Sequence, residues 1–395
     1  MSSLEVRAAL PAAENPLKMR KPAAAPPRRG EERRRAALGE ITNNCPGAGG
    51  TTKKTKTTSK PSRVQKVKPT TEVVPVQAAE APPPVSEEPS VKEEKEQEEE
   101  KELCRAFSET LLDVLDVDEQ DADQPQLCSQ YVKDIYKYLH VLEVQQEVRA
   151  DYMQGYEITE RMRSLLVDWL VQVHSRFQLL QETLYLTVAV LDRFLQVQPV
   201  SRRKLQLVGV TAMMVACKYE EMFAPEVGDF AYVTDNAFTK PQILEMEQLV
   251  LKRLNFQLGR PLPLHFLRRC SKVADSDVER HTLAKYLLEL TLLDYQLVHY
   301  RPSELAAASL CLSQLLLDGL PWSAAQRHYS TYDEDRLKPV MQRIAKNVVA
   351  VNEGTSKFLA VKTKYSSSRL MKISLLPQLQ SCVLKKMASA PLNEP

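Results

Sequence analysis

Residues 205–217 form the segment that most restricts how this chain can fold. The segment is apolar except at Gln206, Gly209 and Thr211, and it is too short to cross a bilayer. A helix that is apolar on nearly every side must be enclosed by other elements. The segment therefore predicts the central helix of a helical bundle, and we expect no insertion into membranes.

Helical periodicity fills the chain on both sides of this segment. Apolar residues recur three and four positions apart over residues 131–142 and then in two sets of five stretches, and no segment alternates as a strand would. The first set covers residues 159–177, 183–195, 205–221, 227–232 and 240–254, and the second covers 264–272, 277–295, 304–317, 324–330 and 334–351. Thr159 would cap the first stretch, and Pro241 would lie in the first turn of the fifth. Because the two sets match in order and length, they predict an all-α fold of two tandem five-helix bundles.

The first hundred residues do not have the composition of a bundle. No Phe, Tyr or Trp precedes Phe107, and about half of the 25 prolines lie before it. Such a segment cannot bury enough apolar surface to offset its chain entropy. We expect a disordered regulatory tail over residues 1–102 and a linker with an N-terminal helix over 103–158. The first bundle would occupy 159–258, and the second bundle with a C-terminal extension 259–385.

Net charge separates the tail from the predicted bundles. Residues 1–80 hold sixteen Lys and Arg against seven Asp and Glu (+9), and residues 81–102 hold three against nine (−6). Because the whole chain carries +2, residues 103–395 carry 2 − 9 + 6, or −1. A folded region without net positive charge argues against nucleic-acid binding.

No constellation of catalytic or metal-binding residues is visible. The six histidines lie apart, no Gly-rich phosphate loop or nucleophile elbow occurs, and the seven cysteines form no C-x-x-C pair. We therefore expect no catalytic residue, no cofactor, no metal and no disulfide framework. An odd number of cysteines without such a framework favours a reducing compartment, the cytosol or the nucleus.

Four motifs within the first set carry a resemblance to a known family. They are MRSLLVDWL at 162–170, LDRFL at 191–195, KLQLVG at 204–209 and ACKYEE at 216–221. In this order they resemble the cyclin box, and over residues 127–385 the chain resembles vertebrate B-type mitotic cyclins, among them the shorter second isoform. The resemblance implies two five-helix cyclin boxes and a non-catalytic activating subunit of a mitotic cyclin-dependent kinase. It also implies a cytoplasmic protein that exchanges with the nucleus around mitosis.

Five residues match the positions that mark this family: Arg163, Asp192, Leu207, Lys218 and Glu247. The resemblance implies that Arg163 and Asp192 form an ion pair inside the first box, and that Lys218 and Glu247 bind the kinase beside its regulatory helix. Apolar contacts would surround them, from Tyr219, Leu251, Phe256, Leu258, Ile135 and Tyr138. The residues alone leave another interpretation open, in which Lys218 extends to solvent and Glu247 lies on a solvated face.

A second predicted site lies on the stretch 159–177. Met162, Leu165 and Trp169 share one helical face, which by spacing alone would belong to the core. The resemblance implies that part of this face, with Leu205 and Gln206, binds Arg-x-Leu motifs of kinase substrates. Gln172 stands where S-phase cyclins have a glutamate. An amide cannot form the charge-assisted bond of a carboxylate, so we expect weaker or altered docking.

A third group of residues is basic. Arg268, Arg269, His281 and Lys285 lie on the first two stretches of the second set, with His281 and Lys285 one helical turn apart. The group is either a solvated basic face or a pocket for phosphorylated Ser or Thr on substrates or regulators.

The tail contains the sequence RAALGEITN at residues 35–43. It resembles the destruction box that B-type cyclins present to the anaphase-promoting ubiquitin ligase, and the matching positions are Arg35, Leu38, Gly39, Ile41 and Asn43. The shorter pattern Arg-x-x-Leu also begins at Arg163, Arg202 and Arg280, but these matches fall in or beside predicted helices, and a receptor that binds an extended peptide needs unstructured chain. A chance match in a low-complexity tail is the alternative. The residues Leu103, Phe107, Leu111, Leu112 and Val114 resemble a nuclear export signal or, equally, an interaction helix.

Two other families are alternatives to a mitotic cyclin. A transcription-type cyclin would lack the motif at 35–43 and the B-type sequence RPLPLHF at 260–266. A DNA-binding initiation factor built from two similar boxes would have a basic folded region and an N-terminal zinc ribbon, neither of which this sequence contains.

Deleting residues 35–43 should make the protein persist through mitotic exit, because the ubiquitin ligase would lose its recognition segment. Protein abundance followed through a synchronised division measures this. Normal disappearance of the deletion variant would contradict the assignment.

Overall fold

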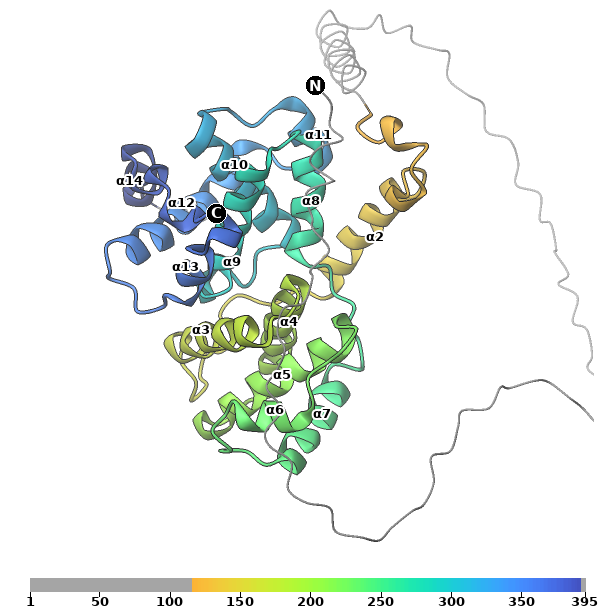
Figure 1. Cartoon of the computed structure of the whole chain (residues 1–395), viewed down its shortest axis with the longest axis vertical. Coiled ribbons are helices and arrows are strands. Elements are labelled where there is room, and N and C mark those ends of the chain that lie inside the picture. Colours follow the sequence, from red (N-terminus) through yellow and green to blue (C-terminus); the bar gives the residue numbers. More distant parts are fainter. Residues whose placement is uncertain (1–115, 392–395) are drawn as a thin grey trace, which may run out of the picture. The chain divides into compact units, whose positions relative to one another are not determined.

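The computed structural model describes residues 116–391 (Figure 1), in which helices and turns alternate without any strand. The predicted tail over 1–102, its motif at 35–43 and the segment 103–114 lie outside the described residues.

The described residues contain a leading helix followed by two sets of five helices. The leading helix is α2 (Val132–Gln145). The first set is α3 (Glu160–Phe177), α4 (Gln181–Val197), α5 (Leu205–Glu220), α6 (Val227–Tyr232) and α7 (Lys240–Arg253). The second set is α8 (Pro263–Val273), α9 (Val278–Thr291), α10 (Pro302–Asp318), α11 (Ala324–Ser330) and α12 (Glu334–Asn352), and a C-terminal extension carries α13 (Ala360–Tyr365) and α14 (Cys382–Ser389). The predicted all-α fold with two successive five-helix bundles is confirmed.

Short 3-10 turns connect several of these helices. They are η1 (Glu119–Asp121), η2 (Pro125–Leu127), η3 (Arg202–Lys204), η4 (Tyr295–Leu297), η5 (Ser368–Leu370), η6 (Ile373–Leu375) and η7 (Pro377–Gln380). One of them corrects a prediction: the stretch 277–295 is not one helix, because α9 ends at Thr291. The Asp294 side chain accepts a hydrogen bond from the backbone N–H of Gln296 at 3.1 Å and so begins η4 instead.

Side chains at the helix starts explain two boundaries. The Thr159 hydroxyl accepts from the backbone N–H of Met162 at 3.4 Å, as predicted for the start of α3. At α7, Thr239 and Gln242 form a reciprocal capping box, and Pro241 lies in the first turn, where its missing N–H has no intrahelical partner to lose.

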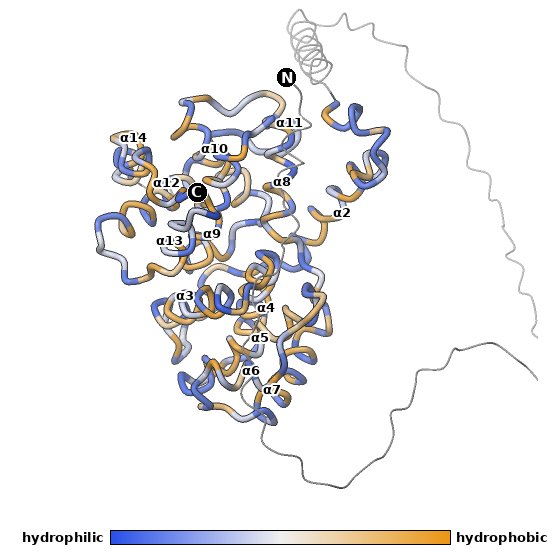
Figure 2. The backbone as a smooth tube through the Cα atoms, in the orientation of Figure 1, coloured by the Kyte–Doolittle hydropathy of each residue, from blue (hydrophilic) through white to orange (hydrophobic). Residues whose placement is uncertain are grey.

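The apolar segment forms the centre of the first bundle, as predicted. Every residue of α5 is buried except Gln206, Lys218, Tyr219 and Glu220, and the helix packs against α3, α4 and α7. Figure 2 shows the hydrophobic residues running along α4 and α5. Gly209 allows the close approach of α3, because a Cβ there would lie 2.7 Å from Cδ1 of Leu166.

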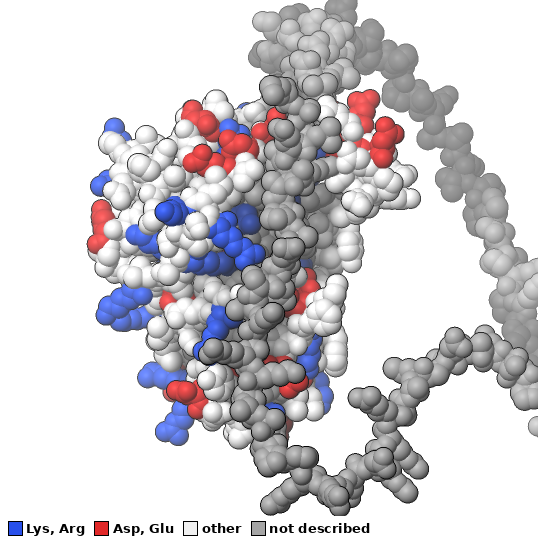
Figure 3. All heavy atoms as spheres, viewed as in Figure 1, with Lys and Arg blue, Asp and Glu red and all other residues white. Residues whose placement is uncertain are grey.

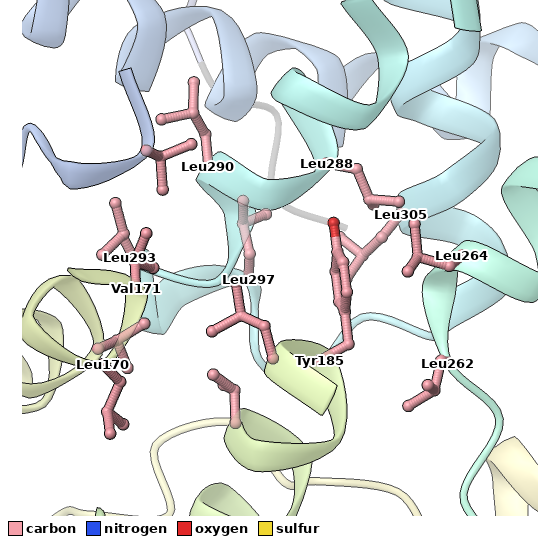
Figure 4. Close-up of a cluster of buried hydrophobic side chains, with 14 of the residues drawn as sticks. Leu170, Val171, Tyr185, Leu262, Leu264, Leu288, Leu290, Leu293, Leu297 and Leu305 are labelled. Atoms are coloured by element: carbon pink, nitrogen blue, oxygen red, sulfur yellow. The ribbon is translucent and has the colours of Figure 1, made fainter. Parts of the chain in front are cut away.

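The two bundles share buried side chains where they meet (Figure 4). Leu170 of α3 and Tyr185 of α4 lie in one cluster with Leu288 of α9, Leu305 of α10 and Leu262 of the connecting segment. The junction is therefore part of the hydrophobic core and not a solvated hinge.

A buried ion pair fixes this junction. The Arg163 guanidinium donates to both carboxylate oxygens of Asp192, at 2.6 and 2.7 Å, and its Nη1 donates to the Leu292 carbonyl of the second bundle at 3.0 Å. The Tyr152 hydroxyl donates to the same carboxylate at 2.8 Å. Burial opposes the charge of Arg163, but the attraction and hydrogen bonds of Asp192 outweigh it and raise the pKa of Arg163. The predicted pair of Arg163 and Asp192 is present.

Replacing Arg163→Ala should lower the free energy of unfolding by about 3–5 kcal/mol, because it leaves Asp192 buried without its cation. Arg161→Ala is the matched control on the same helix, since Arg161 is exposed, and should change it by about 0.5 kcal/mol or less. Urea unfolding of the whole chain measures both. Equal losses for the two variants would contradict the account.

Candidate functional site

The leading helix α2 exposes a row of apolar side chains and buries one carboxylate. Ile135, Tyr138, Val141 and Val144 are exposed, whereas Glu143 is only 1% exposed. Lys133, Asp134 and Lys137 are exposed as well, while Tyr136 and Leu139 pack against the core. An exposed row of apolar residues on a helix that is already bound by its opposite face is typical of a surface that binds a partner.

The opposite face of α2 is bound to the second bundle through apolar and polar side chains. The Glu143 carboxylate accepts from the backbone N–H of Ser303 at 3.1 Å and from its hydroxyl at 2.7 Å, and it lies 2.7 Å from Nδ1 of His140. The Tyr136 hydroxyl donates to the carbonyl of His265 at 2.9 Å. These bonds satisfy the buried polar groups and fix which face of α2 remains accessible.

A charged pair lies where α5 leaves the core. The Lys218 ammonium is 2.6 Å from the Glu247 carboxylate of α7, with 47% and 13% of the two side chains exposed. Because Lys218 is open to solvent, which screens the attraction, the pair contributes only about 0–1 kcal/mol to stability. Stability therefore does not account for placing a lysine at the end of the most apolar helix.

An exposed aromatic ring lies in the turn after α7. Asn255 and Phe256 both have left-handed backbone conformations, with φ of 50° and 57°, and the Phe256 N–H donates to the Leu251 carbonyl at 2.9 Å. This conformation is costly for a bulky residue, and it leaves Phe256 67% exposed. Strain retained in order to expose an aromatic ring is a feature of functional surfaces.

Contacts around Gly259 connect these parts. A Cβ at Gly259 would lie 3.1 Å from the hydroxyl of Tyr219, whose ring is exposed. The absence of a side chain at Gly259 therefore leaves room for this hydroxyl. Gln146, just after α2, donates its side-chain amide to the Gly259 carbonyl at 3.3 Å. In the view of Figure 1, α2 and α7 lie along the same side.

The structure pairs Lys218 with Glu247 and bonds Phe256 to Leu251, whereas Ile135 and Tyr138 lie on α2, which reaches the connecting segment through Gln146. Tyr219, Phe256, Ile135 and Tyr138 are exposed, and Leu251 and Leu258 are half-buried. We call these eight residues, which do not include Gln146, the kinase-contact surface, after the predicted partner.

Two further exposed residues, which the sequence did not predict, follow Lys218 and Tyr219 along the chain. Met222 and Phe223 directly follow the end of α5 and are each 87% exposed. The sequence did contain a signal for them. Met222 and Phe223 are two apolar residues that stand between the charged end of the buried helix and Pro225. A turn at this place leaves them outside the core.

The predicted docking face on α3 is partly open. Leu165 and Gln172 are exposed, Met162, Trp169 and Gln206 are half-buried, and Leu205 is only 5% exposed, as the first residue of the central helix. The open part of the face therefore consists mainly of Leu165 and Gln172.

Gln172 has a partner within its own helix. Its amide donates to Oδ2 of Asp168 at 3.2 Å, and Oδ1 of Asp168 accepts from the backbone N–H of Ala360 at 2.9 Å. The Asp168 carboxylate is thus engaged in joining α3 to α13.

The predicted basic group is smaller than expected. Arg268 pairs with Glu182 of α4, and His281 lies near it, with Nδ1 2.8 Å from the Ser271 hydroxyl. Arg269 was grouped with them in error: it is buried and pairs with Asp118, because consecutive helical residues point about 100° apart.

Burial controls the charges in this group. Burial, with the nearby Lys285 and Arg268, lowers the pKa of His281 to about 4, so the ring is uncharged at neutral pH. Burial also lowers the pKa of Lys285, whose ammonium forms no hydrogen bond or ion pair within residues 116–391. The positive charge available for a ligand therefore comes from Arg268 and Lys285.

Within residues 116–391, no helix is long and apolar enough to cross a membrane, and no group of three His, Cys, Asp or Glu side chains could hold a metal ion. On the face in Figure 3, Asp and Glu side chains accompany the Lys and Arg side chains, so this face is not uniformly basic.

Comparison with known proteins decides between the families that the sequence suggested. The cyclin N-terminal domain matches residues 134–259, and the cyclin C-terminal domain matches residues 261–379. The chain belongs to the cyclin family. G2/mitotic-specific cyclin-B2 of Oryzias curvinotus is 71% identical over 400 residues, which covers 100% of both chains. The human protein of that name is 56% identical over 330 residues, 82% of this chain and 81% of the relative.

These matches confirm the resemblance to mitotic B-type cyclins and set aside the transcription-type and initiation-factor alternatives. The cyclin is a regulatory subunit of a mitotic cyclin-dependent kinase and not itself a catalyst. Its function therefore depends on the surfaces that it presents to the kinase and to other proteins.

Proposed function

We propose that this cyclin binds and activates its kinase through the kinase-contact surface. The observation that carries the proposal is the Lys218–Glu247 pair, with its Nζ–Oε1 distance of 2.6 Å, which lies at the end of the buried helix next to the exposed ring of Tyr219. The pair offers both donors and acceptors to a partner, because Lys218 has three N–H groups and Glu247 has a second oxygen. Tyr138, Tyr219 and Phe256 supply the kind of aromatic contacts that carry most binding energy in interfaces.

Activation follows from selecting one kinase conformation. Phosphoryl transfer requires the ion pair between the strand lysine and the glutamate of the regulatory helix, together with an ordered activation loop. A cyclin that binds only the conformer with this helix turned inward shifts the population toward it. Moving the ratio from about 1:99 to 99:1 requires roughly 5.5 kcal/mol of differential binding. A few desolvated aromatic and charged contacts can provide that amount.

Replacing Lys218→Ala together with Glu247→Ala should reduce activation by about a hundredfold, the loss of a strong interface contact. Because solvent reaches Lys218, the pair contributes little to stability, and the melting temperature should change little. Histone phosphorylation by monomeric mitotic kinase, already phosphorylated on its activation loop, measures the effect.

Lys240→Ala with Glu245→Ala removes two exposed charges from the same helix α7 and serves as the matched control. Full activation by the Lys218 and Glu247 double variant would refute the proposed contact. An equal loss of kinase activation in the control would show that removing any two charges from α7 has this effect, and it would also refute the proposed contact.

We further infer that the face around Leu165 binds Arg-x-Leu motifs of substrates, with lower affinity than a cyclin that has a glutamate at position 172. Leu165 offers an exposed apolar contact. The nearby carboxylate of Asp168 is engaged by Gln172 and Ala360 and is not free for the arginine of the motif. A carboxylate at position 172 would restore a charge-assisted bond.

Gln172→Glu should tighten binding of an Arg-x-Leu peptide several-fold, although repulsion from Asp168 limits the gain. Gln248→Glu, an exposed position on α7, adds the same charge away from the face. Isothermal titration of the peptide compares the three proteins. No gain over the Gln248 control would remove the argument.

We also infer that Arg268, His281 and Lys285 bind phosphorylated Ser or Thr. Lys285 is a half-buried cation without a protein partner in the described residues, and its positive charge favours an anion. Arg268 is held by Glu182, so a phosphate would have to displace this carboxylate.

Arg268→Ala with Lys285→Ala should abolish measurable binding of a phosphoserine peptide, whereas Glu182→Gln should strengthen it, because the internal competitor is removed. Arg203→Ala with Lys204→Ala removes two exposed cations elsewhere. Fluorescence anisotropy with phosphorylated and unphosphorylated peptide measures the difference. Unchanged phosphopeptide binding in the first variant would exclude the pocket.

We infer that the anaphase-promoting ligase recognises the cyclin through Arg35–Asn43 and removes it at mitotic exit. In support, the Arg-x-x-Leu matches at Arg163, Arg202 and Arg280 begin in α3, η3 and α9, whose hydrogen-bonded backbones are unsuited to an extended-peptide receptor. Another match, Arg7–Leu10, is followed by Pro11 and Ala13 where the longer motif has Gly39 and Ile41. Nuclear export through Leu103–Val114 remains a prediction of the same kind.

A further inference from the structure

A buried acidic contact holds the segment before α2 against α8. Asp118 is 4% exposed, and its two carboxylate oxygens accept from Nη1 and Nη2 of Arg269 at 2.5 and 2.6 Å. Lys272 donates to Asp118 at 2.8 Å and also pairs with Asp121. Burial alone would raise the pKa of Asp118, but the bonds from Arg269 and Lys272 lower it, so the carboxylate stays charged.

The same guanidinium also contacts α2 itself. The Arg269 Cζ lies 5.4 Å from the ring centre of Tyr136, which belongs to α2, and 5.0 Å from that of Tyr329 on α11. The Tyr329 hydroxyl accepts from the backbone N–H of Val117 at 3.2 Å. Arg269 therefore joins the leading segment, α2 and α11 in one contact, and Asp118 fixes its position.

This contact matters because α2 lies outside both bundles. The helix has 14 residues, a length that is marginal for a helix on its own, and one of its faces is left open. A partner that had to order α2 would lose binding energy to that ordering. Holding α2 in advance removes this loss.

We propose that Asp118 is a positioning residue for kinase binding: by fixing Arg269 it holds α2 so that Ile135 and Tyr138 are presented in place. The proposal rests on the proposed function. It differs from a general stabilising role, because only α2 and its contacts with the kinase should depend on Asp118.

The test uses the full chain with Asp118→Asn, which keeps the shape and removes the charge. Asp123→Asn, at an exposed position in the same segment, is the matched control, and Asp118→Glu tests rescue by a retained charge. We expect α2 amides of Asp118→Asn to exchange hydrogen about tenfold faster or more, and amides of the central helix α5 to keep their rate. Kinase affinity should fall by about tenfold, with partial recovery in Asp118→Glu.

A second comparison separates positioning from stability. In a background carrying Ile135→Ala and Tyr138→Ala, Asp118→Asn should cause little further loss of kinase affinity, because the contacts that it positions are already gone. An equal loss in both backgrounds, or faster exchange in α5 as well as α2, would overturn the proposal. Unchanged α2 exchange would overturn it too. If the unmodified chain failed to bind the kinase, the proposed function would fail first, and this inference with it.

Discussion

The buried pair of Arg163 and Asp192 is the interaction on which the functional surface depends. It ties α3 to α4, and through the Leu292 carbonyl it ties the first bundle to the second. The kinase-contact surface draws on both bundles: Lys218 and Glu247 lie on the first, whereas α2 is held by α8 and α10 of the second. A surface assembled in this way stays continuous only if the junction between the bundles is rigid. The shared hydrophobic cluster at that junction serves the same end.

Functional residues occur where the chain departs from ordinary folding rules. The central helix α5 is buried up to Cys217 and carries Lys218 in its last turn. Phe256 is exposed in a left-handed conformation, and α2 buries Glu143 while exposing Tyr138. Each departure is costly or neutral for stability, and each places a group on the kinase-contact surface. Such local conflicts are expected at functional sites, where binding and not stability determines the residue.

Much of the fold could be predicted from the sequence, because periodicity and capping are local. The helices at 227–232 and 324–330 and the cap at Thr159 were predicted at their observed positions. The pairing of Lys218 with Glu247 came from the family resemblance, since the residues are 29 positions apart. Nothing local could pair Asp118 with Arg269, which is 151 positions away, and this is why Arg269 was placed with its neighbour Arg268.

The most direct test of the account is a hydrogen-exchange comparison of the full chain alone and bound to its kinase. The account predicts slower exchange on binding in α2, at the end of α5 through residues 216–223, and over residues 251–258. Exchange in α14, far along the chain in the C-terminal extension, should not change. Protection confined to α3 or α14, with α2 and the end of α5 unaffected, would contradict the assignment of the kinase-contact surface.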